Sequence, residues 1–206
     1  MIKRLAPWIF SALFAACASK KEANHEKTFM TTQDPHTFAQ PDSARMTHLS
    51  LDLTVDFKRQ VLEGTATCSV DVQPGSTSVI FDTRDLHIAS VAVDGQPVQD
   101  FQLGDSVAYL GQALRVPVTT GKHSVSIRYS TSPQASALQW LSPQQTAGKK
   151  YPFLFTQSQA ILARTWAPVQ DSPGIRFTYD ATLHVPDGLM AVMSAENPTA
   201  RSKDGV

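Results

Sequence analysis

A charge excess of either sign is missing from this 206-residue sequence. Its 18 Lys and Arg residues balance 18 Asp and Glu residues, and basic residues form no block longer than a pair, such as Lys149-Lys150. Proteins that bind nucleic acid through its phosphates carry a clustered basic patch. The composition therefore argues against nucleic acid as a partner. Once a polar leader is set aside, roughly 160 residues remain, a suitable size for one folded domain.

Long apolar runs are also missing, since the longest largely apolar stretch covers only about ten residues, from Leu5 to Phe14. Such a stretch is too short to span a bilayer. It is preceded by Lys3 and Arg4 and followed by two alanines and Cys17, which is the pattern of an export signal. A buried helix is a poor alternative, because the polar residues 18–40 offer it nothing to pack upon.

Cysteine is scarce, with two residues, Cys17 and Cys68. The small residues before Cys17 resemble the bacterial lipoprotein box, so we predict a signal peptide over residues 1–17 and lipidation of Cys17. The protein would then be exported to the cell envelope, on the periplasmic side of the outer membrane. Phe14 is bulkier than the usual aliphatic residue, so ordinary signal cleavage and release into the periplasm is the alternative. Lipidation would leave Cys68 without a disulfide partner, and we expect a buried, inert thiol.

Several catalytic motifs are absent from the sequence. It has no Gly-rich phosphate loop and no Gly-x-Ser-x-Gly elbow. A zinc protease helix needs His-Glu-x-x-His, but the only His-Glu pair, His25-Glu26, has Phe29 where the second histidine should stand. We therefore expect no metal site and no cofactor in this chain. The other histidines are scattered and are interpreted as exposed strand or loop residues: His36, His48, His87, His123 and His184.

The sequence pattern changes after an extended polar segment. Residues 18–45 are polar and lack apolar periodicity, which predicts a flexible tether. From Leu49 to Phe57 every odd position is apolar and every even position polar, as in a half-buried antiparallel strand. A second alternating run, residues 65–72, follows a polar break and predicts a hairpin. We expect one β domain over residues 46–206, incomplete at its C-terminal end.

Alternation and turn signals predict an all-β, mainly antiparallel fold, either a sandwich or a saddle-like pair of sheets. The Asp94-Gly95 pair predicts a tight hairpin turn. Residues 114–118 and 123–129 are expected to pair with each other. One break in the pattern, residues 135–168, includes a stretch from Ser158 to Trp166 that suits about two turns of helix. The remaining strands are expected at residues 78–83, 86–93, 97–103 and 177–185, with another beginning over 189–194.

Two glutamines in an apolar run are the best candidates for a binding site. Each glutamine side chain offers both a carbonyl acceptor and an amide donor. On an extended segment, Gln157 and Gln159 would point the same way and suit the amine and carbonyl groups of a peptide. The alternative is that they only satisfy neighbouring backbone groups. Arg164 and Asp171 are expected to pair and fix the same turn, while Trp140 and Trp166 are interpreted as core or pocket wall.

One long stretch of this region carries a family resemblance. Residues 138–164 read L-Q-W-L-S-P-Q-Q-T-A-G-K-K-Y-P-F-L-F-T-Q-S-Q-A-I-L-A-R, followed by Q-D-S-P at 170–173 and F-T-Y at 177–179. Together with F-D-T-R-D-L-H-I at 81–88, this resembles the N-terminal domain of the zinc aminopeptidase family that includes leukotriene-A4 hydrolase, in a bacterial member. The resemblance covers roughly Thr47 to Ala195.

The resemblance implies a zinc metallopeptidase in which a saddle-like β domain precedes a thermolysin-like catalytic domain. The segment matching Gln157, Ser158 and Gln159 lines the active-site cleft in that family. Gln159 is thereby implied as the main contact to the free amino group or first carbonyl of a peptide. Gln157 comes next, and Ser158 contributes mainly its backbone. The zinc ligands and the catalytic tyrosine would lie beyond Val206, so zinc would belong to the full-length parent.

Two hypotheses follow from the sequence. The first is a non-catalytic, substrate-positioning domain of an exported zinc aminopeptidase, truncated before the catalytic domain. That domain would be its missing partner, and without it peptide binding should be weak. The alternative is a free-standing envelope lipoprotein β domain that binds a peptide or a protein partner through exposed apolar surface.

Overall fold

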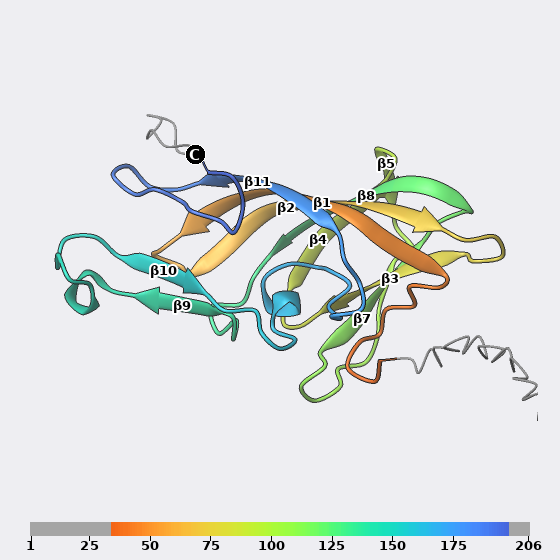
Figure 1. The fold of residues 1–206 in the computed structure, drawn as a ribbon, viewed down its shortest axis with the longest axis horizontal. Helices are drawn as coiled ribbons and strands as arrows, with labels where there is room; N and C mark the ends of the chain where they lie inside the picture. Colours follow the sequence, from red (N-terminus) through yellow and green to blue (C-terminus); the bar gives the residue numbers. More distant parts are fainter. Residues whose placement is uncertain (1–33, 198–206) are drawn as a thin grey trace, which may run out of the picture. The chain divides into compact units, whose positions relative to one another are not determined.

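Strands are the main regular structure of the protein that the computed structural model describes, residues 34–197 (Figure 1). A six-stranded sheet has the order β11-β1-β2-β8-β4-β5, a three-stranded sheet the order β3-β7-β6, and β9 pairs with β10. All pairs are antiparallel except β1 with β11, which is parallel. The predicted all-β, mainly antiparallel fold is confirmed. The elements are β1 (Ala44–Asp56), β2 (Val61–Val72), β3 (Ser78–Thr83), β4 (His87–Val93), β5 (Gln96–Val98), β6 (Gln102–Leu103), β7 (Gln112–Pro117), β8 (Gly121–Ser130), β9 (Leu138–Leu141), β10 (Phe153–Thr156), β11 (Thr178–His184) and two short 3₁₀ helices, η1 (Pro143–Gln145) and η2 (Ala163–Thr165).

The hairpins expected from local signals form as predicted. The β1–β2 pair aligns Leu49 with Cys68 and Leu51 with Ala66, so both apolar faces point into the same core. The turn between β4 and β5 uses Asp94 and Gly95, with φ of 51° and 79°. Asp and Gly tolerate positive φ, which two-residue hairpin turns require. Local pattern and turn chemistry agree here with the observed pairing.

One expected strand pairing is wrong. Strands β7 and β8 do not pair with each other: β7 lies between β3 and β6, whereas β8 lies between β2 and β4. The short link after Val118 crosses from one sheet to the other, so the apolar faces of the two strands share a core instead of an edge. The expected strand over 97–103 also divides, with β5 in the large sheet and β6 in the three-stranded sheet.

Three local predictions near the C-terminal part are wrong. Residues 189–194 form no strand, and the side chain of Asn197 instead closes a small loop on the backbone of Met193. The stretch from Ser158 to Trp166 forms turns and η2 rather than two turns of helix. Strands β9 and β10 form inside the segment that was expected to break the β pattern. A long connection separates these two short strands, so no tight-turn signal marks the hairpin.

The folded domain begins before residue 46. Residues 34–45 were expected as the end of a flexible tether, yet Thr37 and Ala39 are buried. The Thr37 hydroxyl and the Phe38 N–H both donate hydrogen bonds to Asp82 on β3. Cys17 and the predicted signal peptide lie outside the described residues. Within residues 34–197, no helix is long and apolar enough to cross a membrane.

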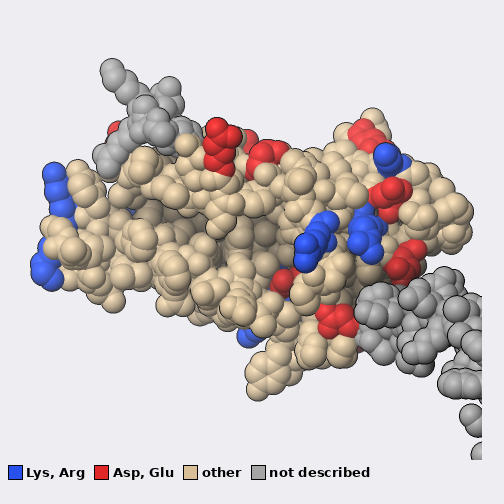
Figure 2. Space-filling model, in the orientation of Figure 1, with Lys and Arg blue, Asp and Glu red and all other residues tan. Residues whose placement is uncertain are grey.

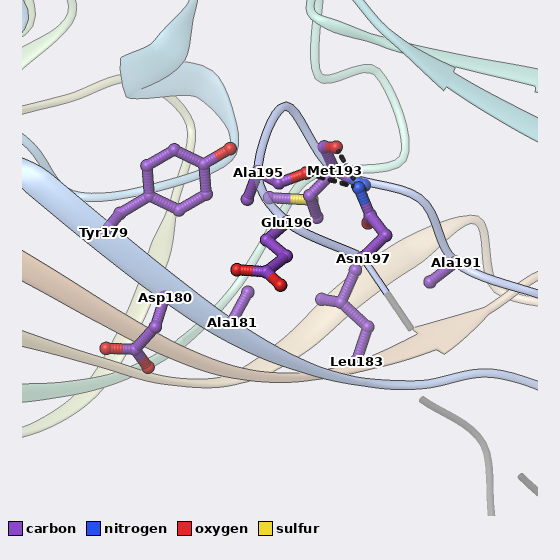
Figure 3. A pocket seen from close by; sticks show the side chains of 9 residues that line it. All are labelled: Tyr179, Asp180, Ala181, Leu183, Ala191, Met193, Ala195, Glu196 and Asn197. Atoms are coloured by element: carbon purple, nitrogen blue, oxygen red, sulfur yellow. Dashed lines mark hydrogen bonds between the residues drawn. The ribbon is translucent and has the colours of Figure 1, made fainter. Parts of the chain in front are cut away.

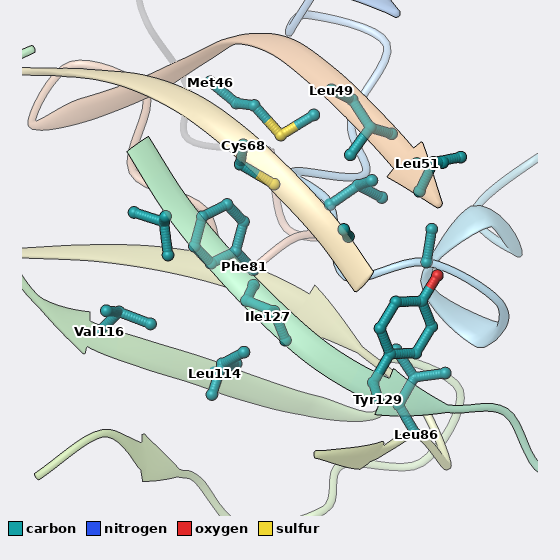
Figure 4. Packing of buried hydrophobic residues seen from close by; sticks show 14 of the residues in the cluster. Met46, Leu49, Leu51, Cys68, Phe81, Leu86, Leu114, Val116, Ile127 and Tyr129 are labelled. Carbon is teal, nitrogen blue, oxygen red and sulfur yellow. The ribbon is translucent and has the colours of Figure 1, made fainter. Parts of the chain in front are cut away.

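The core lies between the six-stranded and three-stranded sheets, where side chains from β1, β2, β3, β7 and β8 point toward one another (Figure 4). Cys68 is fully buried in this core, as expected, and its burial raises the thiol pKa to about 12. A thiol with so high a pKa is almost entirely protonated at neutral pH and is a poor nucleophile. Outside this core, the rings of Phe57 and Trp140 pack edge to face with their centroids 5.4 Å apart. This contact connects the β9–β10 hairpin to the end of β1.

Candidate functional site

Gln157, Ser158 and Gln159, here called the glutamine rim, follow directly after β10. Strand pairing ends at Thr156, so the rim does not continue the extended segment on which the two side chains would point the same way. The Gln157 N–H donates to Ala137 O at 2.9 Å, and its side-chain Oε1 accepts the Gln159 N–H at 3.1 Å. Part of Gln157 therefore satisfies a neighbouring backbone group, the alternative raised from the sequence.

The two glutamine side chains differ in how much of their hydrogen-bonding capacity is used. Both residues are exposed. Within residues 34–197, no hydrogen bond engages the side-chain amide of Gln159 or the amide nitrogen of Gln157. These donors, and the carbonyl oxygen of Gln159, are therefore open to water or to a ligand. The rim presents both donors and acceptors at one place on the surface.

Ser158 has a different role from its neighbours. Its hydroxyl accepts the indole N–H of Trp166 at 3.0 Å, and its carbonyl accepts the Leu162 N–H at 2.8 Å. Both bonds fold the chain back on itself after the rim. Ser158 thus shapes the turn that presents the glutamines, and its side chain is already occupied.

An apolar hollow of about 420 Å³ opens beside the rim, with Gln157 and Ser158 among its lining residues. It lies between the apolar face of β1 and β11 and the segment that follows β10, and Figure 2 shows the surface hollowed there. No ionisable side chain other than Tyr179 lines it. The structure therefore brings Gln157 and Ser158 together at this hollow, whereas Gln159 lies outside its lining. Its other walls include Leu49, Leu53, Trp166, Tyr179, Leu183 and Met193.

A smaller hollow of about 270 Å³ shares Met193 with the larger one and is drawn in Figure 3. It is bounded by β11 and by residues 191–197, and Glu196 points into it beside Asp180 and Tyr179 (Figure 3). Asn197 holds the covering loop closed, since its side-chain nitrogen donates to Met193 O at 2.8 Å and Ala195 O at 2.6 Å. The non-strand segment after β11 thus separates two hollows on the same edge of the large sheet.

A buried polar group, here called the Arg164 cluster, lies behind the rim and consists of Arg164, Asp82, Asp171 and Gln170. Arg164 is 0% exposed, and its Nε donates to Asp171 Oδ2 at 3.0 Å, which confirms the expected pair. Its Nη1 lies 3.7 Å from Asp82 Oδ1. Burial raises the pKa of the Asp82 carboxyl above its ordinary value, while hydrogen bonds from Thr37 and Phe38 and the charge of Arg164 oppose this rise. The cluster fixes η2, which follows the rim, to residue Asp171.

Gln170 completes this cluster and was not singled out by its sequence pattern. Its side chain accepts the Met46 N–H at 2.8 Å and donates to Ala44 O at 2.9 Å and Ile80 O at 3.2 Å. It is 1% exposed, and it joins the start of β1 to β3. A polar Q-D-S-P run has the composition of a surface turn, so its burial could not be read from the sequence.

An exposed aromatic stripe leads along the hairpin to the rim. Tyr151, Phe153 and Phe155 are 44%, 54% and 48% exposed, and they occupy alternate positions before Gln157. Side chains two residues apart in a strand share one face, so Phe153 and Phe155 lie on the same face of β10. The period-two pattern was present in the sequence, and only the unexpected hairpin reveals that this face is open to water.

No metal centre forms in this part of the protein. Among residues 34–197, no three or more His, Cys, Asp or Glu side chains come close enough together to hold a metal ion. The described residues therefore do not fit a zinc site, and no chemical step through zinc can be assigned to them.

Comparison with known proteins agrees with this architecture. Residues 45–205 match the Peptidase M1 N-terminal domain family. The chain is 41% identical over 168 residues to leukotriene A-4 hydrolase from Xenopus laevis, covering 79% of this chain and 27% of that protein. It is 38% identical over 151 residues to leucine aminopeptidase 2 from Yarrowia lipolytica, covering 72% and 23% of the two chains.

Solved structures give the same result. Native leukotriene A4 hydrolase from Saccharomyces cerevisiae superposes with a TM-score of 0.71 at 28% identity, over 77% of this chain and 26% of that one. The sequence thus spans about a quarter of the length of the relatives it matches. The chain belongs to the Peptidase M1 N-terminal domain family.

Proposed function

We propose that this chain positions the N-terminus of a peptide for a zinc aminopeptidase and does not itself cleave the peptide. The observation that carries the proposal is the glutamine rim, whose open amide groups stand beside an apolar hollow. The relatives named above are a leukotriene A-4 hydrolase and a leucine aminopeptidase, which supports a peptide as the ligand.

The chemistry of the rim suits a peptide N-terminus. The free carbonyl oxygen of Gln159 can accept a hydrogen bond from an ammonium group, and its amide nitrogen can donate to a peptide carbonyl. Gln157 keeps its amide nitrogen for the same use, since only its oxygen is engaged. Zinc, held by residues outside this part of the protein, would supply the Lewis acid for hydrolysis.

Binding by the chain alone should be weak. The rim and the apolar hollow are open to water, so a peptide would lose mobility while burying little surface. A dissociation constant of roughly millimolar magnitude corresponds to about 4 kcal/mol of binding free energy. The contacts of two or three amide groups are consistent with this magnitude.

A titration followed by NMR tests the proposal. We expect a tripeptide with a free amino group to shift the side-chain amide signals of Gln157 and Gln159, and its N-acetylated counterpart to leave them unmoved. Gln159→Ala should abolish the response, whereas Gln139→Ala, at an exposed position on β9, should not. Equal shifts with both peptides, or none with either, would refute a role in recognising the amino group.

We also propose that the protein is exported and held at the cell envelope by lipid on Cys17. The lipoprotein-like sequence before Cys17 supports this. A thiol-reactive dye provides a direct test, because Cys68 is buried and should stay unlabelled in the folded protein. We expect no reactive thiol in the chain isolated from membranes. One rapidly labelled thiol in that material would indicate an unmodified Cys17.

A second candidate function rests on the aromatic stripe of Tyr151, Phe153 and Phe155. Three exposed rings in a row are unusual for a surface that meets only water, and they suit contact with another protein. The chain would then be a free-standing envelope domain that binds a partner. Substitution of Phe153 and Phe155 by serine separates the two candidates: it would remove partner binding while leaving the response of Gln159 to a free amino group intact.

A further inference from the structure

A small hairpin on the three-stranded sheet exposes apolar side chains at its tip. Residues 104–111 connect β6 to β7, and the Val107 N–H and Gly111 N–H donate to each other's carbonyl oxygens at 2.8 Å. Tyr109 at the tip is 80% exposed, Val107 44% and Leu103 41%. Within the described residues no hydrogen bond engages the Tyr109 hydroxyl. Residues 104–111, together with Leu103 at the end of β6, are here called the tip loop, which presents a ring and two aliphatic side chains to the surroundings.

The backbone of the tip loop is specialised for this presentation. Tyr109 has φ of 67°, in the left-handed region that bulky residues avoid. Gly111 has φ of 83°, and a Cβ atom there would lie 2.1 Å from Thr83 O. The loop is thus pressed closely against the end of β3 while its ring points outward. A strained conformation that exposes an aromatic ring calls for an explanation beyond folding.

The tip loop lies beside the point where the described chain begins. Nη1 of Arg164 donates to Leu110 O at 3.0 Å, and Nη2 donates to His36 O at 2.8 Å. One buried guanidinium therefore holds the tip loop and the N-terminal segment together, and Figure 1 shows the β6–β7 loop next to the start of the coloured ribbon. The described chain therefore begins on the side of the domain that carries the tip loop.

The upstream sequence limits how far a lipid on Cys17 could be from the tip loop. Residues 18–33 form the whole link between Cys17 and Asp34. Sixteen residues span at most roughly 55 Å, because a fully extended chain rises about 3.3–3.6 Å per residue. A lipid anchor would therefore keep the tip loop near the bilayer at a high effective concentration.

We propose that Leu103, Val107 and Tyr109 form a contact surface for the interfacial zone of a phospholipid bilayer, which orients the domain that the anchor tethers. The proposal rests on the lipid anchor proposed above. Tyrosine favours this zone, because its ring enters the acyl boundary while its hydroxyl stays among the headgroups. Residues 102–111 contain one acidic residue, Asp105, and no Lys or Arg, so apolar insertion rather than attraction to anionic lipid carries the contact.

Such a contact leaves the glutamine rim accessible. The tip loop contributes no residue to the hollow beside Gln157, which lies against the six-stranded sheet. Three partly exposed side chains are too few to hold a protein on a membrane unaided. They are sufficient to select an orientation once a lipid already confines the domain to the surface.

Depth-dependent quenching tests the contact on the full, lipidated chain. Vesicles of phosphatidylethanolamine and phosphatidylglycerol would carry nitroxide-labelled lipid, and an environment-sensitive dye would be attached through Ala108→Cys, at an exposed position beside Tyr109. A dye at Gln144→Cys, exposed in the β9–β10 loop, provides the matched control. We expect several-fold stronger quenching at position 108 than at position 144, and a loss of that difference when Tyr109→Ser is added.

The outcomes separate the contact from the anchor. If the protein floats with the vesicles but both dyes are quenched equally, the membrane contact is overturned and the anchor stands. Unchanged quenching after Tyr109→Ser overturns the assignment of the ring. A protein that does not float with the vesicles at all lacks the anchor, and the contact that depends on it is overturned as well.

Discussion

The glutamine rim and the Arg164 cluster are neighbours in the sequence, yet their polar side chains differ in burial and in hydrogen bonding. Arg164 is fully buried, and its donors reach Asp171, Leu110 and His36, all within this chain. The rim leaves the amide of Gln159 open to solvent. A closed polar cluster stabilises a fold, whereas an open one is available to a ligand. The difference separates residues that stabilise the fold from residues that we propose to bind a peptide.

The largest expected effect comes from Arg164→Met. Removal of the guanidinium would leave the carboxylates of Asp82 and Asp171 without their cation, and three backbone carbonyls without a donor. Breaking a buried ion pair from one side typically costs about 3–5 kcal/mol. Urea unfolding should show a loss of this size, while Arg128→Met at an exposed site on β8 should change stability by less than about 0.5 kcal/mol. Similar losses in both variants would contradict a special role for the cluster.

Substitution of one buried and one exposed glutamine compares the two regions directly. Gln170→Ala would leave the Met46 N–H and the carbonyls of Ala44 and Ile80 unsatisfied in a buried place, at a cost of about 1–3 kcal/mol. Gln157→Ala removes an exposed side chain and should cost less than about 0.5 kcal/mol. Urea unfolding of both variants tests the ranking. If Gln157→Ala proved the more destabilising, the rim would be part of the framework and not a free binding surface.

A third, smaller effect tests the attachment of the N-terminal segment. Thr37→Val keeps the shape of the side chain but removes the hydroxyl that donates to Asp82 Oδ2 at 2.5 Å and accepts the Ala39 N–H at 3.0 Å. A hydrogen bond to a charged group contributes about 1.5–3 kcal/mol, and the Phe38 N–H that remains on Asp82 should keep the loss near the lower figure. Loss of the hydrogen bond from Thr37 should also raise the pKa of Asp82 further, because that bond opposes the effect of burial. Unfolding in urea measures the change in the free energy of unfolding. A value unchanged from the parent would mean that residues 34–39 do not contribute to the stability of the folded domain.

The same contrast explains what could be predicted from the sequence. Alternation over Leu49–Phe57 and the Asp94-Gly95 turn are local signals, and both gave the observed strands and hairpin. The sheet partners of β7 and β8 depend on which core their apolar faces share, which is a long-range property. The rim could be proposed as a site because it lies in a long stretch that resembles a known family, and its binding role stays a prediction. The three buried bonds of Gln170 could not, because nothing local distinguishes a buried glutamine from an exposed one.

The smallest expected effect concerns an ion pair outside both regions, and it has a pH signature. The hydrogen bond that His123 Nδ1 donates to Asp94 Oδ2, at 2.7 Å, raises the pKa of His123 above 6.5, and the same bond lowers the pKa of Asp94 below 3.8. The His123 contribution to stability is therefore present below pH 6.5 and is lost as the pH rises through the higher folded value. The Asp94 contribution is present above pH 3.8 and is lost as the pH falls through the lower folded value.

Asp94→Asn isolates this contribution with little change in structure. Asparagine tolerates the positive φ of the turn and can still accept the Ser124 N–H, so the main loss is the charge that faces His123. Denaturant unfolding of both proteins should show the parent gaining stability relative to the variant near pH 5.5, and losing that advantage toward pH 8. Exposed pairs are screened and contribute little, so the difference should be smaller than any change within the Arg164 cluster. Parallel stability curves for the two proteins would mean that the close contact of Asp94 with His123 contributes nothing measurable to stability.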